Sequence, residues 1–158
     1  AALGILNGYE KSQTIIQEWV GIQNNLGIAY YQKYKQILRN ELANEPQKLE
    51  EQSQYLELAL EVFEAVIKAD IRETLPQEWS KAQTNLGKIY SIRLKGEDSG
   101  NREQAIVAYQ EALKIFNPQQ FPQEWANTQN LLGLAYYYRV QGEFPENLEK
   151  AIESFRAS

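Results

Sequence analysis

The chain contains 158 residues, of which 43% are hydrophobic and 23% are charged, so it is long and apolar enough to fold around a core. Its net charge of −5 argues against a nucleic-acid or anionic-membrane partner, because both need clustered lysine and arginine. Cysteine, histidine and methionine are absent from the sequence, which excludes disulfides, a thiol nucleophile, an imidazole base and the usual zinc sites. We therefore expect no catalytic, metal-binding or cofactor-binding residues, and we expect that the chain is not an enzyme.

One short phrase, Gln-Glu-Trp, occurs three times and contains all three tryptophans, at 17–19, 77–79 and 123–125. A Leu-Gly follows seven residues after each tryptophan, and a tyrosine follows three residues after each glycine. The residues are Leu26, Gly27 and Tyr30, then Leu86, Gly87 and Tyr90, then Leu132, Gly133 and Tyr136. A period of about 45 to 60 residues is typical of stacked helical repeats and not of a globular enzyme.

Residues 1–13 precede the first phrase. Ala1 to Leu6 resemble the end of a helix from a preceding repeat, and Gly8 is suited to close that helix. Because methionine is absent and both ends fall inside repeats, we expect a fragment of a longer array.

The first repeat, residues 14–70, is longer than the next one. Its phrase lies 60 residues before the second, whereas the second lies 46 before the third. Shared equally, the excess adds about two turns to each helix and preserves the phase of both. We predict a first helix that continues through Tyr34 to Leu38, or as far as Leu42, and a second helix that starts at Pro46. The result is a protruding antiparallel hairpin. The alternative interpretation is a disordered insert, but only 40–47 has an irregular pattern.

The later repeats, residues 71–117 and 118–158, each open with a proline-initiated helix. Pro76 and Pro122 suit the first helical turn, and Gly96 and Gly142 suit the C-terminal caps. A second apolar stripe follows each glycine, and we expect it to start behind Asn101 or Asn147. Gln104, three residues after Asn101, predicts a capping box, and Asn117-Pro118 ends the helix.

Each glycine of the repeated phrase lies in a helix interior, where it costs about 1 kcal/mol relative to alanine. We expect that Gly27, Gly87 and Gly133 allow close approach of the second helix. Ala59, Ala105 and Ala151 are predicted to fill that contact. The tryptophans are interpreted as packing anchors between repeats.

The pattern Leu-Gly-x-x-Tyr, followed by Ala-x-x-x-aromatic-x-x-Ala, resembles the tetratricopeptide repeat (TPR). The matching positions include Leu26, Gly27, Tyr30, Ala59, Phe63 and Val66, then Leu86, Gly87, Tyr90, Ala105, Tyr109 and Ala112, then Leu132, Gly133, Tyr136, Ala151, Phe155 and Ser158. The resemblance implies an all-α fold, an alpha-alpha superhelix built as a right-handed solenoid of antiparallel helix pairs, with the first hairpin elongated. The tryptophan-to-leucine step and the gap between the two helices are longer than is usual in the family.

The amino-acid sequence of these repeats also resembles the long repeats of bacterial, especially cyanobacterial, multidomain proteins with caspase-like CHAT or nucleotide-binding signalling domains. Neither domain is present in these 158 residues. A bacterial protein located in the cytoplasm is therefore the expected setting.

The resemblance implies a concave groove, lined by the first helices, that holds a peptide or protein segment. Its groove-facing positions are Gly21, Asn24, Asn25, Ile28 and Tyr31, then Lys81, Thr84, Asn85, Lys88 and Ser91, then Asn127, Asn130, Leu131, Leu134 and Tyr137. Amides suit main-chain recognition, because they both donate and accept, and Lys81 and Lys88 can attract a carboxylate. The family's clamp for a terminal carboxylate is not expected, because Ile28 and Leu131 occupy places that need polar groups. Asn24, Asn85 and Asn130 suit equally well a structural role in bonds to neighbouring helices.

Two other functions remain open on the sequence. The chain could be a spacer or oligomerisation element of a multidomain signalling protein, self-associating through repeat ends where Ile152 and Phe155 are uncovered. An enzyme would have few acid–base groups besides glutamates and tyrosines, since the only aspartates are Asp70 and Asp98. Both lie at predicted helix ends, where a capping role explains them.

Overall fold

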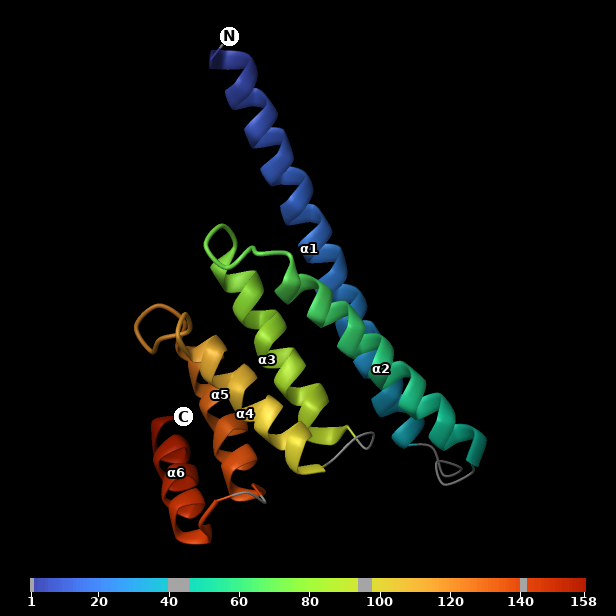
Figure 1. Cartoon of the computed structure of the whole chain (residues 1–158), viewed down its shortest axis with the longest axis vertical. Helices are drawn as coiled ribbons and strands as arrows, with labels where there is room; N and C mark the ends of the chain where they lie inside the picture. The colour runs from blue at the N-terminus through green and yellow to red at the C-terminus, as the bar shows by residue number, and fades with distance from the viewer. Residues whose placement is uncertain (1, 40–45, 94–97, 140–141) are drawn as a thin grey trace.

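The computed structural model describes residues 2–39, 46–93, 98–139 and 142–158. Within these ranges the chain is all-α, as predicted, and contains no strand (Figure 1). The helices are α1 (Ala2–Leu38), α2 (Pro46–Lys68), α3 (Pro76–Ile92), α4 (Asp98–Leu113), α5 (Pro122–Tyr137) and α6 (Phe144–Ala157). None of them combines the length and the apolar character that crossing a bilayer requires.

The helices form three consecutive pairs, α1 with α2, α3 with α4 and α5 with α6, and each pair packs on the next (Figure 1). We call α1, α3 and α5 the A helices and the other three the B helices. Within the described ranges α3 contacts both other A helices, whereas no contact joins α2 with α4 or α4 with α6. The A helices therefore lie closer together than the B helices, as on the inner side of a curved array.

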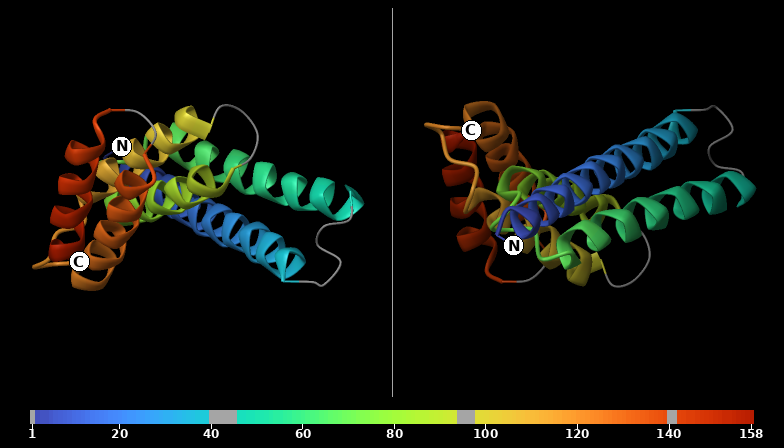
Figure 2. Two further views of the ribbon diagram at one scale, coloured as in Figure 1. Left: turned by 90° about the horizontal axis from the view of Figure 1, so that it is seen from below. Right: turned by 90° about the horizontal axis from the view of Figure 1, so that it is seen from above.

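The elongated first hairpin is confirmed. The helix α1 ends at Leu38 and α2 begins at Pro46, as predicted; Leu42 lies outside the described residues. The C-terminal end of α1 and the start of α2 extend away from the other four helices (Figure 2). At the other end of this hairpin, the first part of α1 extends beyond every other helix (Figure 1).

The prolines mark helix starts as predicted: Pro76 opens α3 and Pro122 opens α5. Both helices begin without a side-chain cap, because Leu75 and Phe121 occupy the cap positions. Asp98 is the first residue of α4 and Asp70 follows the end of α2, in agreement with their predicted helix-end positions.

Several predicted helix ends are wrong. The helix α1 runs without a break through Gly8, so residues 1–13 do not contain the end of a separate helix. Glycine lowers helix propensity by only about 1 kcal/mol, which a helix of 37 residues tolerates. The helix α5 stops at Tyr137, five residues before Gly142, which was predicted to cap it. Gly142 does adopt a left-handed φ of 87°, and Gly96 lies outside the described residues.

The predicted starts of the last two B helices are also wrong. The helix α4 begins at Asp98 and α6 at Phe144, so Asn101 and Asn147 lie inside these helices, and the predicted capping box of Asn101 and Gln104 is not at a helix start. Asn101 is buried, and its amide donates to the Arg93 carbonyl oxygen at 3.1 Å. This asparagine therefore satisfies the end of the preceding helix instead of the start of its own.

The interior glycines do allow close approach, but aromatic rings fill the contact and not the predicted alanines. A Cβ atom added to Gly27 would lie 2.6 Å from Phe63 Cζ, and one on Gly87 would lie 2.5 Å from Tyr109 Cε1. Gly133 faces Phe155 in the same way. The alanines Ala59, Ala105 and Ala151, four residues before each ring, are also buried.

The three tryptophans differ. Trp79 is buried in the core formed mainly by α2 and α3, with the Arg72 guanidinium 4.8 Å from its ring centroid. Trp125 is half-buried and Trp19 is 37% exposed. The prediction that every tryptophan is wedged between pairs is therefore wrong for Trp19, because no described helix covers that face of α1.

Candidate binding groove

Two adjacent cavities lie along the A helices and share one residue, Lys88. The larger has a volume of about 420 Å³ and is lined by Tyr31, Lys88, Ser91, Ile92, Arg102, Tyr109, Leu131, Leu134, Ala135 and Tyr138. The smaller has a volume of about 120 Å³ and is lined by Lys81, Thr84, Asn85, Lys88, Phe116, Glu124, Asn127 and Thr128. Together we call them the groove.

Most of the predicted groove residues meet in these cavities. Tyr31, Lys88 and Leu134 line the larger one, together with Ser91 and Leu131 of the wider predicted pattern. Lys81, Thr84, Asn85, Lys88 and Asn127 line the smaller one. The A-helix pattern thus brings these positions together from α1, α3 and α5.

Other predicted residues lie outside both cavities. Asn24 is buried, and its Nδ2 donates to Glu78 Oε2 on α3 at 3.1 Å, so the structural interpretation holds for this asparagine. Ile28, Asn130 and Tyr137 are exposed on the A helices. They are available to a longer partner but line neither cavity.

Lys88 is the central polar group of the groove. Its Nζ donates to Asn85 Oδ1 at 3.2 Å. Burial lowers the pKa of Lys88, and the positive charge of Lys35 lowers it further. No carboxylate lines the larger cavity, and among the described residues Lys88 forms no ion pair. Lys81 differs, because its Nζ lies 2.7 Å from Glu78 Oε1.

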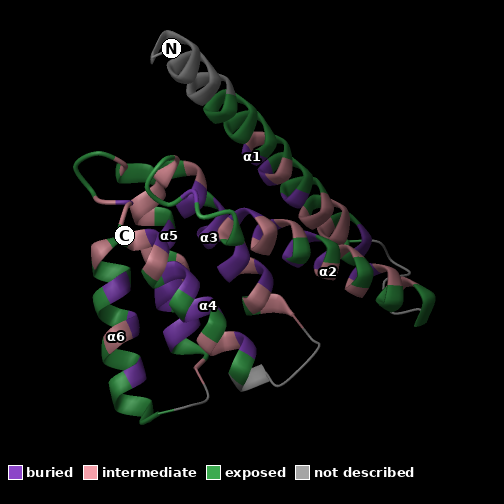
Figure 3. Cartoon of the chain, turned by 45° about the horizontal axis from the view of Figure 1, so that its top comes forward, coloured by how far each residue is buried: buried purple, intermediate pink, exposed green. Residues whose placement is uncertain are grey.

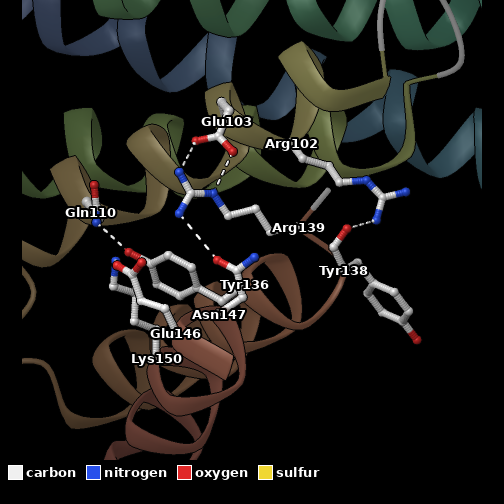
Figure 4. A network of polar contacts seen from close by, with 9 residues as sticks. All are labelled: Arg102, Glu103, Gln110, Tyr136, Tyr138, Arg139, Glu146, Asn147 and Lys150. Atoms are coloured by element: carbon white, nitrogen blue, oxygen red, sulfur yellow. Dashed lines mark hydrogen bonds and ion pairs between the residues drawn. The ribbon is translucent and has the colours of Figure 1, made fainter. Parts of the chain in front are cut away.

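A second cation, which the sequence analysis missed, reaches the larger cavity from a B helix. The guanidinium of Arg102 on α4 donates to the Tyr138 carbonyl oxygen and lies 5.8 Å from the Tyr138 ring centroid (Figure 4). Arg102 and Tyr138 stand where the preceding repeat has Leu56 and Ile92. This replacement of an apolar pair by an arginine and a tyrosine was the signal in the sequence that could have identified Arg102.

Tyr109 was placed in the core by the repeat pattern, yet it also forms part of the wall of the larger cavity. Its hydroxyl lies 3.2 Å from Ser91 Oγ. Burial raises the pKa of Tyr109, so the phenol stays protonated at neutral pH and can share a proton with an acceptor.

Two equivalent ion pairs join neighbouring helix pairs. Arg93 Nε and Nη2 donate to Glu57 Oε1 and Oε2 at 2.9 and 2.8 Å. Arg139 binds Glu103 in the same bidentate way, at 2.7 and 3.0 Å (Figure 4). In each pair the arginine lies 36 residues after the glutamate, and the second pair lies 46 residues after the first, which is the repeat period. This recurrence was a signal in the sequence for both ion pairs. These contacts fix adjacent pairs in one register.

The repeated tyrosines take part in the same junctions. Tyr90 donates to Glu64 Oε1 at 3.1 Å, and Tyr136 accepts from Gln110 Nε2 at 2.8 Å (Figure 4). Where α3 meets α5, Thr84 Oγ1 lies 3.3 Å from Thr128 Oγ1. Each threonine also donates to a carbonyl oxygen in its own helix, Ser80 or Glu124.

The groove offers hydrogen-bonding, cationic and aromatic groups, and these are the elements of a binding surface. Within the described residues no group of three or more histidine, cysteine, aspartate or glutamate side chains is placed to hold a metal ion. Comparison of the chain with protein-family models, with curated proteins and with solved structures finds no match.

Proposed function

We propose that the chain is a protein-interaction scaffold that binds a peptide or protein segment along α1, α3 and α5. The observation that carries the proposal is the pair of adjacent cavities joined at Lys88. The resemblance of the repeated phrase to TPR sequences supports the same interpretation. A bacterial and cytoplasmic setting remains a prediction of that resemblance.

The chemistry of the groove favours a segment with an acidic group beside an apolar side chain. Lys88 and Arg102 supply positive charge, and no carboxylate of the larger cavity opposes an incoming one. Tyr31, Leu134 and Tyr138 supply apolar and aromatic surface next to these cations. Asn85 and Asn127 are suited to bond the main chain of the bound segment.

A phage-displayed library of random peptides, selected on the purified chain, tests this proposal. We expect the selected peptides to be enriched in aspartate or glutamate next to an aromatic or aliphatic residue. Their affinities are then measured by fluorescence polarisation with synthetic peptides. Lys88→Glu and Leu134→Asp should each weaken binding by roughly tenfold or more, which corresponds to about 1.4 kcal/mol.

Lys114→Glu provides the matched control. It makes the same charge change directly after the end of α4, outside both cavities, at an exposed residue paired with Glu111. Such a pair contributes little to stability, so peptide affinity should stay at the wild-type level. The proposal is overturned if no peptide is selected, or if Lys88→Glu and Leu134→Asp bind as tightly as this control.

A spacer or oligomerisation element is the second candidate function. The observation that favours it is the apolar side chains exposed on α1 and on α6.

A further inference from the structure

Each end of the helix array exposes an apolar face. On α1 the exposed side chains follow a helical spacing of three and four and are Ile15, Ile16, Trp19, Ile22 and Leu26. On α6 they are Phe144, Leu148, Ile152 and Phe155. Figure 3 shows exposed residues along much of both helices. We call these surfaces the α1 face and the α6 face.

The α6 face occupies the positions that accept the following A helix elsewhere in the molecule. Ile152 and Phe155 align with Ile106 and Tyr109 of α4, 46 residues earlier. Ile106 and Tyr109 are only 5% and 1% exposed, because they lie in the core between α4 and α5. Ile152, in contrast, is 41% exposed. The α6 face is thus the B-helix side of a junction that no described A helix covers.

The α1 face is the other side of such a junction. Its Trp19 and Leu26 align with Trp79 and Leu86 of α3, 60 residues later. Both α3 residues are buried in the core that α3 forms with α2. Ile22, which is 62% exposed, aligns with Ala82, which is fully buried. The two ends therefore carry the two complementary halves of one interface.

We propose that the α6 face of one copy binds the α1 face of a second copy, in the register in which α4 binds α5. The interface joins two different surfaces, so it leaves one face free at each end and allows further copies to add. This proposal does not depend on the groove or on its ligand.

Charge at the interface agrees with this register. The internal junctions pair Arg93 with Glu57 and Arg139 with Glu103. By alignment, the junction between copies places Lys33 of one chain opposite Glu149 of the other. A lysine forms a single point contact with a carboxylate and not the bidentate pair of an arginine, so this contact is weaker than its internal counterparts.

Two variants, each blocking one face, test the proposal by light scattering and sedimentation from micromolar to millimolar concentration. Ile22→Asp places a charge on the α1 face and Ile152→Asp places one on the α6 face; both residues are exposed, so circular dichroism should show unchanged helix content. We expect the wild type to grow beyond a dimer as concentration rises, and each variant alone to remain monomeric. An equimolar mixture of the two should form dimers, because one intact interface remains.

Each other outcome overturns the proposal. If the wild type stays monomeric at every concentration, the α1 and α6 faces of two copies do not bind each other, and these faces are suited instead to further repeats of a longer chain. If only Ile22→Asp abolishes association, two α1 faces pair with each other. If the mixture stays monomeric while the wild type associates, the two faces do not bind one another.

A charge exchange tests the register itself. Lys33→Glu and Glu149→Lys should each weaken association by roughly fivefold to tenfold, and the chain carrying both changes should recover the wild-type affinity. Lys114→Glu, which lies on neither face, controls for the change in net charge. Equal weakening by the control, or failure of the double variant to recover, contradicts the proposed register.

Discussion

The second and third helix pairs contain the same glycine–aromatic contact but bury it to different extents. A Cβ on Gly87 or on Gly133 would lie 2.5 or 2.6 Å from the facing ring, Tyr109 or Phe155. Tyr109 is 1% exposed, whereas Phe155 is 38% exposed, because α5 is the only described helix that packs on α6. We infer from this comparison that the freedom of the ring to move, and not the contact distance, determines whether glycine is required.

The largest expected effect is that of Gly87→Ala. The added methyl group meets a ring that is 1% exposed and hydrogen-bonded to Ser91, so the ring or the two helices must shift to make room. We expect the free energy of unfolding to fall by about 1–3 kcal/mol, the usual cost of overpacking a core. Urea denaturation followed by circular dichroism measures this loss.

Gly21→Ala is the matched control for that substitution. A Cβ at Gly21 meets no atom within 4 Å, so only helix propensity changes. The free energy of unfolding should rise by up to about 1 kcal/mol. Changes of the same sign at Gly21 and Gly87 would show that the ring contact is not what matters.

Gly133→Ala should have a smaller effect than Gly87→Ala. The exposed Phe155 ring can rotate toward solvent to make room for the methyl group. The gain in helix propensity then offsets much of the cost, and we expect stability within about 1 kcal/mol of wild type. A loss as large as that of Gly87→Ala would contradict the role assigned to burial.

The smallest effect concerns pH at the junctions between pairs. The hydrogen bond from Lys68 is the main cause that lowers the pKa of Glu64, and the bond from Tyr90 adds to it. A carboxyl whose pKa is lower when folded stabilises the fold above its unfolded pKa, and this contribution is lost as pH falls through about 4 and below. We expect about 0.5 kcal/mol or less, because the side chain is partly exposed.

Glu64→Gln isolates this contribution, because the equivalent position of the next junction is already a glutamine, Gln110. Urea denaturation at pH 7 and at pH 3 should show wild type losing its advantage over the variant at the lower pH. An advantage that persists or grows at pH 3 would exclude Glu64 as its source.

The sequence predicted the helix pairs well where local chemistry and a repeat agreed. Prolines at 46, 76 and 122 marked helix starts, and the extra 14 residues of the first repeat produced two longer helices in phase. Prediction failed where a single residue was the only signal for a helix boundary. Gly8 does not end α1, because a helix of 37 residues tolerates the cost of one glycine. Asn101 bonds to the preceding helix instead of capping its own, and spacing along one helix does not reveal that contact.

The groove was also predicted only in part. The groove-facing pattern implied by the resemblance to TPR sequences placed Tyr31, Lys88 and Leu134 on one side of the A helices, and these residues do meet at the larger cavity. Arg102 was missed because it reaches that cavity from a B helix, which depends on how α4 packs against α5 and not on spacing along one helix.

The hydroxyl pair of Thr84 and Thr128 has a consequence for the size of what can be held. These two small side chains touch where α3 and α5 approach each other, and both are buried. Bulkier side chains there would push the two helices apart, whereas smaller ones would let them close in. For the segment that we propose binds in the groove, the permitted size is therefore set by the residues that separate the groove walls as well as by those that line it. Selectivity can then be altered without changing any group that recognises the segment.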